Sequence, residues 1–94
     1  MCTSSCSYEI RVNKDDIMHH CRFSIEKKLG NGDPSITCCE YVRNANVEEI
    51  CEAFTEADKA KIALWKWVKV TRKCGNALAT GHDCAGYVVQ PPMS

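Results

Sequence analysis

The chain lacks a long hydrophobic run, because no apolar stretch reaches the roughly 18 residues that a membrane-spanning helix needs. It also lacks net charge, since 12 basic and 12 acidic residues cancel. This balance argues against non-specific electrostatic binding of nucleic acid. No basic start and apolar stretch of a secretory leader follow Met1. We therefore expect a mature domain whose leader has been removed, with Met1 added for expression.

Cysteine is abundant instead, with eight residues among 94. This even number is near the level that marks a disulfide scaffold in a small secreted protein. Each native bridge in such a domain typically contributes about 2–5 kcal/mol. We predict one cysteine-rich α/β domain over residues 1–94 in which all eight cysteines form disulfides, with the pairing left open among 105 possibilities: Cys2, Cys6, Cys21, Cys38, Cys39, Cys51, Cys74 and Cys84.

The first half of the chain reads as strand, helix and strand. Residues 7–12 alternate apolar and polar side chains, which is typical of a half-buried strand. Asn13 and Asp16 resemble a capping box that opens an amphipathic helix of about 16 residues, and Gly30 suits its end. The stretch "SITCCEYV" then begins a second strand, at about 35–43.

The second half of the chain also reads as strand, helix and strand. Residues 48–54 are interpreted as a third strand, although their apolar positions also fit a helical period near 3.6. Thr55 and Asp58 form a second capping pattern before a long helix at 56–74, and a last strand is expected at 84–90. The order predicts an α+β fold: a small disulfide-stapled βαββαβ sandwich of the split β-α-β, ferredoxin-like type, with two helices on one face of an antiparallel sheet.

Two adjacent cysteines in a strand point to opposite faces of the sheet. We therefore expect Cys38 and Cys39 to form two bridges that leave in opposite directions, rather than one bridge between neighbours. Structural zinc is the alternative, because Cys2-x3-Cys6, His19-His20-Cys21 and His82-x-Cys84 gather potential ligands. The absence of any Cys-x2-Cys pair favours disulfides over zinc, and we predict no cofactor.

The long helix carries the candidate binding surface. On a helical wheel Trp65 and Trp67 fall on an apolar side, and basic residues fall on the other. Such a helix can bind a partner protein or an anionic membrane surface, although a solvated outer face of a core helix explains the same pattern and is favoured. The basic candidates are Lys59, Lys66, Lys69 and Lys73.

The order of elements and cysteines resembles a known family. A helix with an inward Cys21, a strand with Cys39, the run "ICEAF-TEADKAKI", a helix closed by Cys74-Gly75, and "GHDC" before a last strand follow one another. This arrangement is similar to the α subunit of the virus-encoded killer toxin of smut fungi and to secreted fungal effectors that share its fold. The resemblance implies an α/β sandwich held by four disulfides, secretion, and no shared catalytic residues.

We therefore expect a secreted, extracellular, non-enzymatic effector or toxin-like protein of a plant-pathogenic fungus. It would bind a host or competitor protein, or an anionic membrane surface, with no role for nucleic acid. The alternatives are a zinc-organised effector module inside host cells and an inhibitor of a secreted hydrolase.

Overall fold

A computed structural model describes residues 12–30 and 32–91 of the chain. The described part is mostly helical, and a two-stranded antiparallel hairpin is the sheet found within it. The elements are α2 (Lys14–His20), α3 (Arg22–Ile25), α4 (Ile36–Arg43), α5 (Val47–Ala53), α6 (Glu56–Lys61), α7 (Leu64–Lys73), β1 (Asp83–Cys84) and β2 (Tyr87–Val88).

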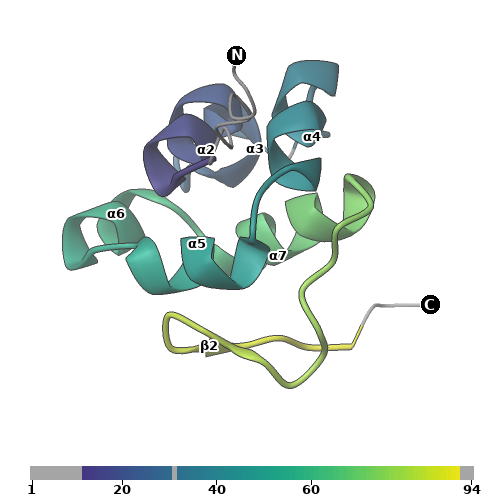
Figure 1. Cartoon of the computed structure of the whole chain (residues 1–94). Coiled ribbons are helices and arrows are strands. Elements are labelled where there is room, and N and C mark those ends of the chain that lie inside the picture. Colours follow the sequence, from purple (N-terminus) through teal and green to yellow (C-terminus); the bar gives the residue numbers. More distant parts are fainter. Residues whose placement is uncertain (1–11, 31, 92–94) are drawn as a thin grey trace, which may run out of the picture.

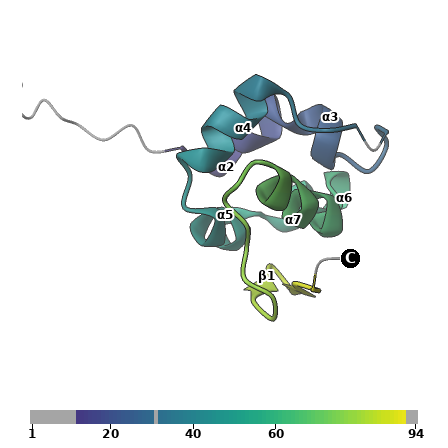
Figure 2. The same ribbon diagram turned by 90° about the vertical axis from the view of Figure 1, so that its right-hand side faces the viewer.

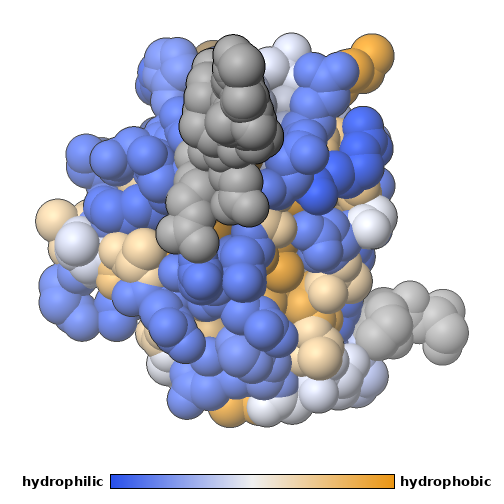
Figure 3. Space-filling view, viewed as in Figure 1, coloured by the Kyte–Doolittle hydropathy of each residue, from blue (hydrophilic) through white to orange (hydrophobic). Residues whose placement is uncertain are grey.

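The helices form two tiers with the hairpin beneath them (Figure 1). One tier holds α2, α3 and α4, and the other holds α5, α6 and α7. Helix α7 lies against both α3 and α4, and α5 lies against β1. Hydrophilic side chains cover most of the face seen in Figure 3, as expected for helices that turn their apolar sides inward.

The predicted α+β sandwich is wrong. Residues assigned to the second and third strands form α4 and α5, and the last strand is a short hairpin. Both α4 and α5 begin with a side-chain cap. The Ser35 hydroxyl accepts from the Cys38 amide, and the Asn46 side chain accepts from the Glu49 amide. The capping serine and asparagine thus decide between strand and helix where the apolar spacing is ambiguous.

Both capping boxes predicted from the sequence are confirmed, at Asn13 with Asp16 and at Thr55 with Asp58. The two helices that they open are each split into two. The first is interrupted at Cys21, between α2 and α3, and the second at Ile62–Ala63, between α6 and α7.

The end of α3 and the α6–α7 interruption lie against each other. Their backbones form an isolated antiparallel bridge between Glu26 and Ile62. The Lys27 amide donates to the Lys61 carbonyl at 2.8 Å, and the Ala63 amide donates to the Ile25 carbonyl at 2.9 Å. The end of α3 and the α6–α7 interruption therefore form with each other backbone hydrogen bonds that they do not form within a helix.

Three disulfides tie the two tiers and the hairpin together. Cys21–Cys38 joins the α2–α3 junction to α4, Cys39–Cys74 joins α4 to the end of α7, and Cys51–Cys84 joins α5 to β1. The adjacent cysteines form two separate bridges as predicted, but from a helix. Disulfide bonding is confirmed for these six cysteines. Cys2, Cys6 and nearly all of the strand predicted at 7–12 lie outside the described residues.

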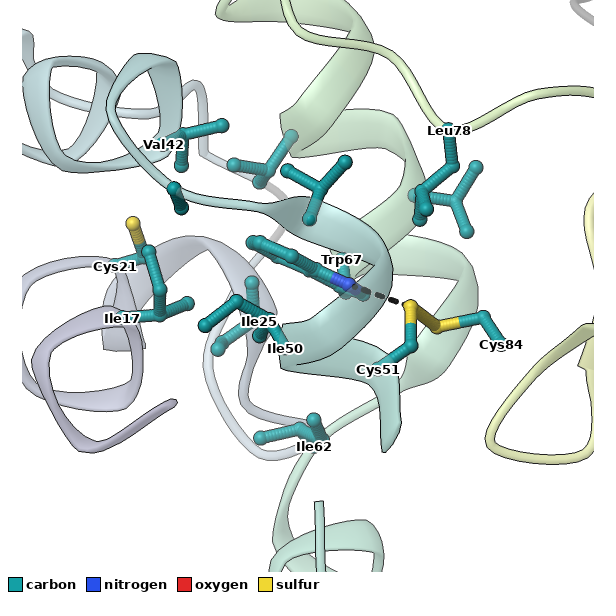
Figure 4. Close-up of a cluster of buried hydrophobic side chains, with 14 of the residues drawn as sticks. Ile17, Cys21, Ile25, Val42, Ile50, Cys51, Ile62, Trp67, Leu78 and Cys84 are labelled. Atoms are coloured by element: carbon teal, nitrogen blue, oxygen red, sulfur yellow. Dashed lines mark hydrogen bonds between the residues drawn. A yellow bond between two sulfur atoms is a disulfide. The ribbon is translucent and has the colours of Figure 1, made fainter. Parts of the chain in front are cut away.

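The core is centred on Trp67, which is fully buried (Figure 4). Its indole Nε1 donates to the Cys51 sulfur at 3.4 Å, and its ring meets Phe54 edge-on at 6.0 Å between ring centres. Ile17, Ile25 and Ile62, each from a different segment, are also almost completely buried in this core. The largest of the fully buried side chains thus occupies the place where the two tiers meet.

Replacing Trp67 by alanine should lower the free energy of unfolding by about 3–5 kcal/mol, because it leaves a large cavity among side chains that cannot collapse. The matched control is Trp65→Ala on the same helix, where the indole is 47% exposed and the loss should stay below about 1 kcal/mol. Denaturant unfolding followed by circular dichroism, with disulfides intact, measures both. Equal losses would contradict the central position of Trp67.

An ion pair joins the beginnings of α2 and α6. The Lys14 ammonium donates to the Asp58 carboxylate, which also caps α6 through the Thr55 amide. This hydrogen bond from Lys14 is the main reason that the pKa of Asp58 lies below its ordinary value of 3.8. The same bond raises the pKa of Lys14 above 10.5. The ion pair therefore stabilises the fold at pH values between the pKa of Asp58 and the pKa of Lys14. This stabilisation is lost as the pH falls through the depressed pKa of Asp58.

Asp58→Asn should lower the melting temperature at pH 7, and the difference from the unmodified chain should shrink as the pH falls below 3.8. Asp15→Asn is the control, since Asp15 is highly exposed and lies 3.6 Å from the same ammonium. It should change the melting temperature much less at either pH. A deficit in Asp58→Asn that persists at acidic pH would show that the charge of Asp58 is not what stabilises this junction.

Candidate ligand-binding groove

Helix α7 has one buried and one exposed side. Trp65, Lys69 and Lys73 follow one another at intervals of four residues, and this spacing places them along one side of the helix. All three are exposed. The side chains that turn to the core are Trp67, Val68, Val70, Thr71 and, at the end of the helix, Cys74.

A groove of about 540 Å³ runs between the exposed side of α7 and the C-terminal segment. Figure 2 shows α7 at the centre, with the hairpin below it. Trp65 contributes the exposed apolar surface of the helix, beside the buried Val68, and Tyr87 and Pro91 contribute that of the segment. This volume lies within the range of about 300–1,000 Å³ that is typical of small-molecule sites.

The C-terminal wall is fixed at several points. The Cys51–Cys84 disulfide anchors the hairpin to α5, and the Arg72 guanidinium donates to the Gln90 carbonyl. Between β1 and β2 the chain turns through Ala85 and Gly86, both at positive φ, as a two-residue hairpin turn requires. These contacts therefore hold the C-terminal wall of the groove in place.

One edge of the groove is basic. Lys69, Arg72 and Lys73 all line it. Lys73 pairs with Asp33 at 2.8 Å, and the hydrogen bond from Lys73, assisted by the charge of Lys69, holds the pKa of Asp33 below its ordinary value. Within the described residues, Lys69 and Arg72 have no carboxylate partner within 4.0 Å. An apolar groove with a positive edge is suited to an amphipathic anion.

Residues 2–84 match the model of a family described as probable lipid transfer. The chain belongs to this lipid-transfer family. No curated protein and no solved structure matches the chain. The family has a helical, disulfide-rich fold and is generally non-enzymatic, and the six described helices and three disulfides of this member agree with it.

Membership in the lipid-transfer family corrects one implication of the killer-toxin resemblance, since the α/β sandwich that it predicted is absent from the described residues. The cysteine order from which the resemblance was drawn is equally compatible with a helical scaffold. Among the described residues, no helix is long and apolar enough to cross a membrane.

The predicted basic surface of this lipid-transfer family member is only partly exposed. Lys66 is just 5% exposed, and its ammonium donates to the Glu26 and Leu29 carbonyls at 2.9 and 2.8 Å, so it fixes the chain after α3. Lys59 pairs with Glu56 at 2.9 Å and lies within 3.4 Å of the Ala85 carbonyl.

Of the four predicted lysines, Lys69 and Lys73 line the groove. Arg72 lines it too although it was not among the four candidates, and Trp65, which was expected on the apolar side, faces outward. The regular spacing of Trp65, Lys69 and Lys73 was the signal that could have revealed this side of the helix.

The two histidine–cysteine clusters that suggested zinc have other roles, and the third cluster, Cys2 with Cys6, lies outside the described residues. Cys21 and Cys84 are disulfide-bonded and cannot serve as thiolate ligands. His20 stacks on Tyr41 at 4.1 Å, and His82 lies 4.0 Å from the Glu48 carboxylate. No group of three or more metal-ligating side chains is assembled in the part of the chain that the structure describes.

Proposed function

We propose that this protein is a secreted, non-enzymatic carrier that binds the acyl chain of a single-chain lipid in the groove beside α7. The observation that carries the proposal is the pairing of an apolar groove with a basic edge in a chain of the lipid-transfer family. Three disulfides in so short a chain support an oxidising, extracellular compartment.

The interior offers a poorer place for an acyl chain. Trp67 and its neighbours already fill the meeting point of the two tiers, and protein interiors of this kind are close-packed. A chain bound there would have to displace the indole from its bond to Cys51. A chain in the groove instead covers Trp65 and Tyr87, which are already in contact with solvent, and so removes apolar surface from water without opening the core.

The basic edge orients the ligand. With the acyl chain against Trp65 and Tyr87, a carboxylate or phosphate headgroup can lie near Lys69 and Arg72, which have no carboxylate partners among the described residues. Because the groove is open to water, the headgroup keeps part of its hydration and the charge contributes modestly to affinity. The apolar contacts therefore supply most of the binding energy.

The effector or toxin-like role of a fungal protein remains a prediction, as do a host or competitor protein as its target and the zinc-dependent or inhibitor alternatives. A lipid-binding groove is compatible with an extracellular effector, and the lipid proposal does not depend on it.

Trp65→Gln should weaken binding of a fluorescent long-chain fatty acid roughly tenfold, which corresponds to about 1.4 kcal/mol, because it removes the exposed aromatic wall of the groove. The matched control is Phe23→Gln, which removes a 69% exposed aromatic side chain that does not line the groove. Its affinity should stay within about twofold of the unmodified protein, as a solvent-exposed site away from the ligand allows. Fluorescence titration measures both.

Failure of the unmodified protein to bind any single-chain lipid would overturn the proposed function. Binding that Trp65→Gln and Phe23→Gln leave equally intact would place the lipid elsewhere on the molecule.

A further inference from the structure

The charges of this neutral chain are unevenly distributed. Positions 59–82 contain no acidic residue, whereas six of the 12 basic residues lie in 59–73. Acidic residues gather just before this stretch, and the three on α5 are all exposed: Glu48, Glu49 and Glu52. In Figure 2, α5 lies to the left of α7, and α6 lies to the right. The α5 side of the molecule is therefore acidic, and α7 itself carries basic residues and no acidic ones.

The exposed side of α7 combines this positive charge with an amphipathic aromatic side chain. Trp65 is 47% exposed, and Lys69 and Lys73 follow it along the helix. Tryptophan favours the boundary between headgroups and acyl chains, where its ring meets apolar material and its N–H meets water. Lysines beside it are attracted to anionic headgroups.

Asp33 is the acidic residue that touches this face, through its 2.8 Å pair with Lys73. Its side chain is 78% exposed. In an exposed pair of this kind the two charges attract each other weakly, so a dense array of anionic headgroups can compete with Asp33 for Lys73.

We propose that the Trp65–Lys69–Lys73 face docks on membranes that carry anionic headgroups, an inference that extends the proposed lipid function by naming where the groove is loaded. Docking by this face places the groove, which Trp65 itself lines, directly against the bilayer. The acidic α5 side disfavours the opposite orientation on the same surface, because like charges repel. The charge complementarity between α7 and anionic headgroups thus selects both the partner and the orientation.

The test is flotation of the full chain with vesicles of phosphatidylcholine, with and without phosphatidylglycerol. The protein should float with the anionic vesicles and much less with pure phosphatidylcholine, and added salt should release it because exposed charges are screened. Lys69→Gln should reduce the bound fraction several-fold, whereas Arg43→Gln, which removes an equal charge from α4 outside the groove, should not.

A gain of binding provides the sharper variant, because a misfolded protein would not produce it. Asp33→Asn frees Lys73 and removes a negative charge from the face, so it should increase binding to anionic vesicles several-fold. Glu52→Gln makes the same change in net charge on the exposed surface of α5 and should have little effect. Equal gains from both variants would show that net charge, and not this face, controls docking.

An uncharged single-chain lipid, such as a monoacylglycerol, separates this inference from the proposed function. If the protein binds the monoacylglycerol but does not float with anionic vesicles, the docking inference is wrong and the groove proposal stands. If it floats but binds no single-chain lipid, the docking inference stands and the proposed function is wrong. Equal flotation with neutral and anionic vesicles, or capture of neither, would overturn the inference.

Discussion

The Trp67 indole is the side chain on which the rest of the structure depends. It sits where the two tiers of helices meet, bonded to the Cys51 sulfur, and Cys51 in turn fixes the hairpin through Cys84. One residue thus links the core to the disulfide that holds the C-terminal wall of the groove. Because this indole fills the centre, the proposed function places the apolar ligand on the outer side of α7, beside Trp65, which is two residues away along the same helix.

The disulfides allow short helices to form a stable fold. The described helices have 4 to 10 residues, and helices of this length are marginal in isolation. Cys38 and Cys39 connect α4 both to the α2–α3 junction and to the end of α7. The bridges constrain the unfolded chain and so compensate for a small core. The outer side of α7 can then remain exposed, since it is not needed for burial.

Local capping signals in the sequence were interpreted correctly at two helix starts and missed at two others, and contacts between distant segments could not be predicted. The caps at Asn13 and Thr55 were predicted correctly because a cap depends on residues three positions apart. The interruption at Ile62 could not be predicted, since it is stabilised by the backbone of Glu26, which is distant in sequence. Strand formers around the double cysteine suggested a sheet, but Ser35 and Asn46 begin helices there. Lys66 was assigned to the surface because sequence alone does not reveal the carbonyl groups that its ammonium meets.

Quenching of tryptophan fluorescence by a fatty acid brominated on its acyl chain tests most directly whether the ligand lies outside a filled core. Bromine quenches only on close contact, and the two tryptophans of this chain occupy the two alternative places. The account predicts quenching in the unmodified protein and none in a folded Trp65→Phe variant, whose remaining indole is Trp67. Quenching of equal strength in Trp65→Phe would place the acyl chain in the interior and contradict the account.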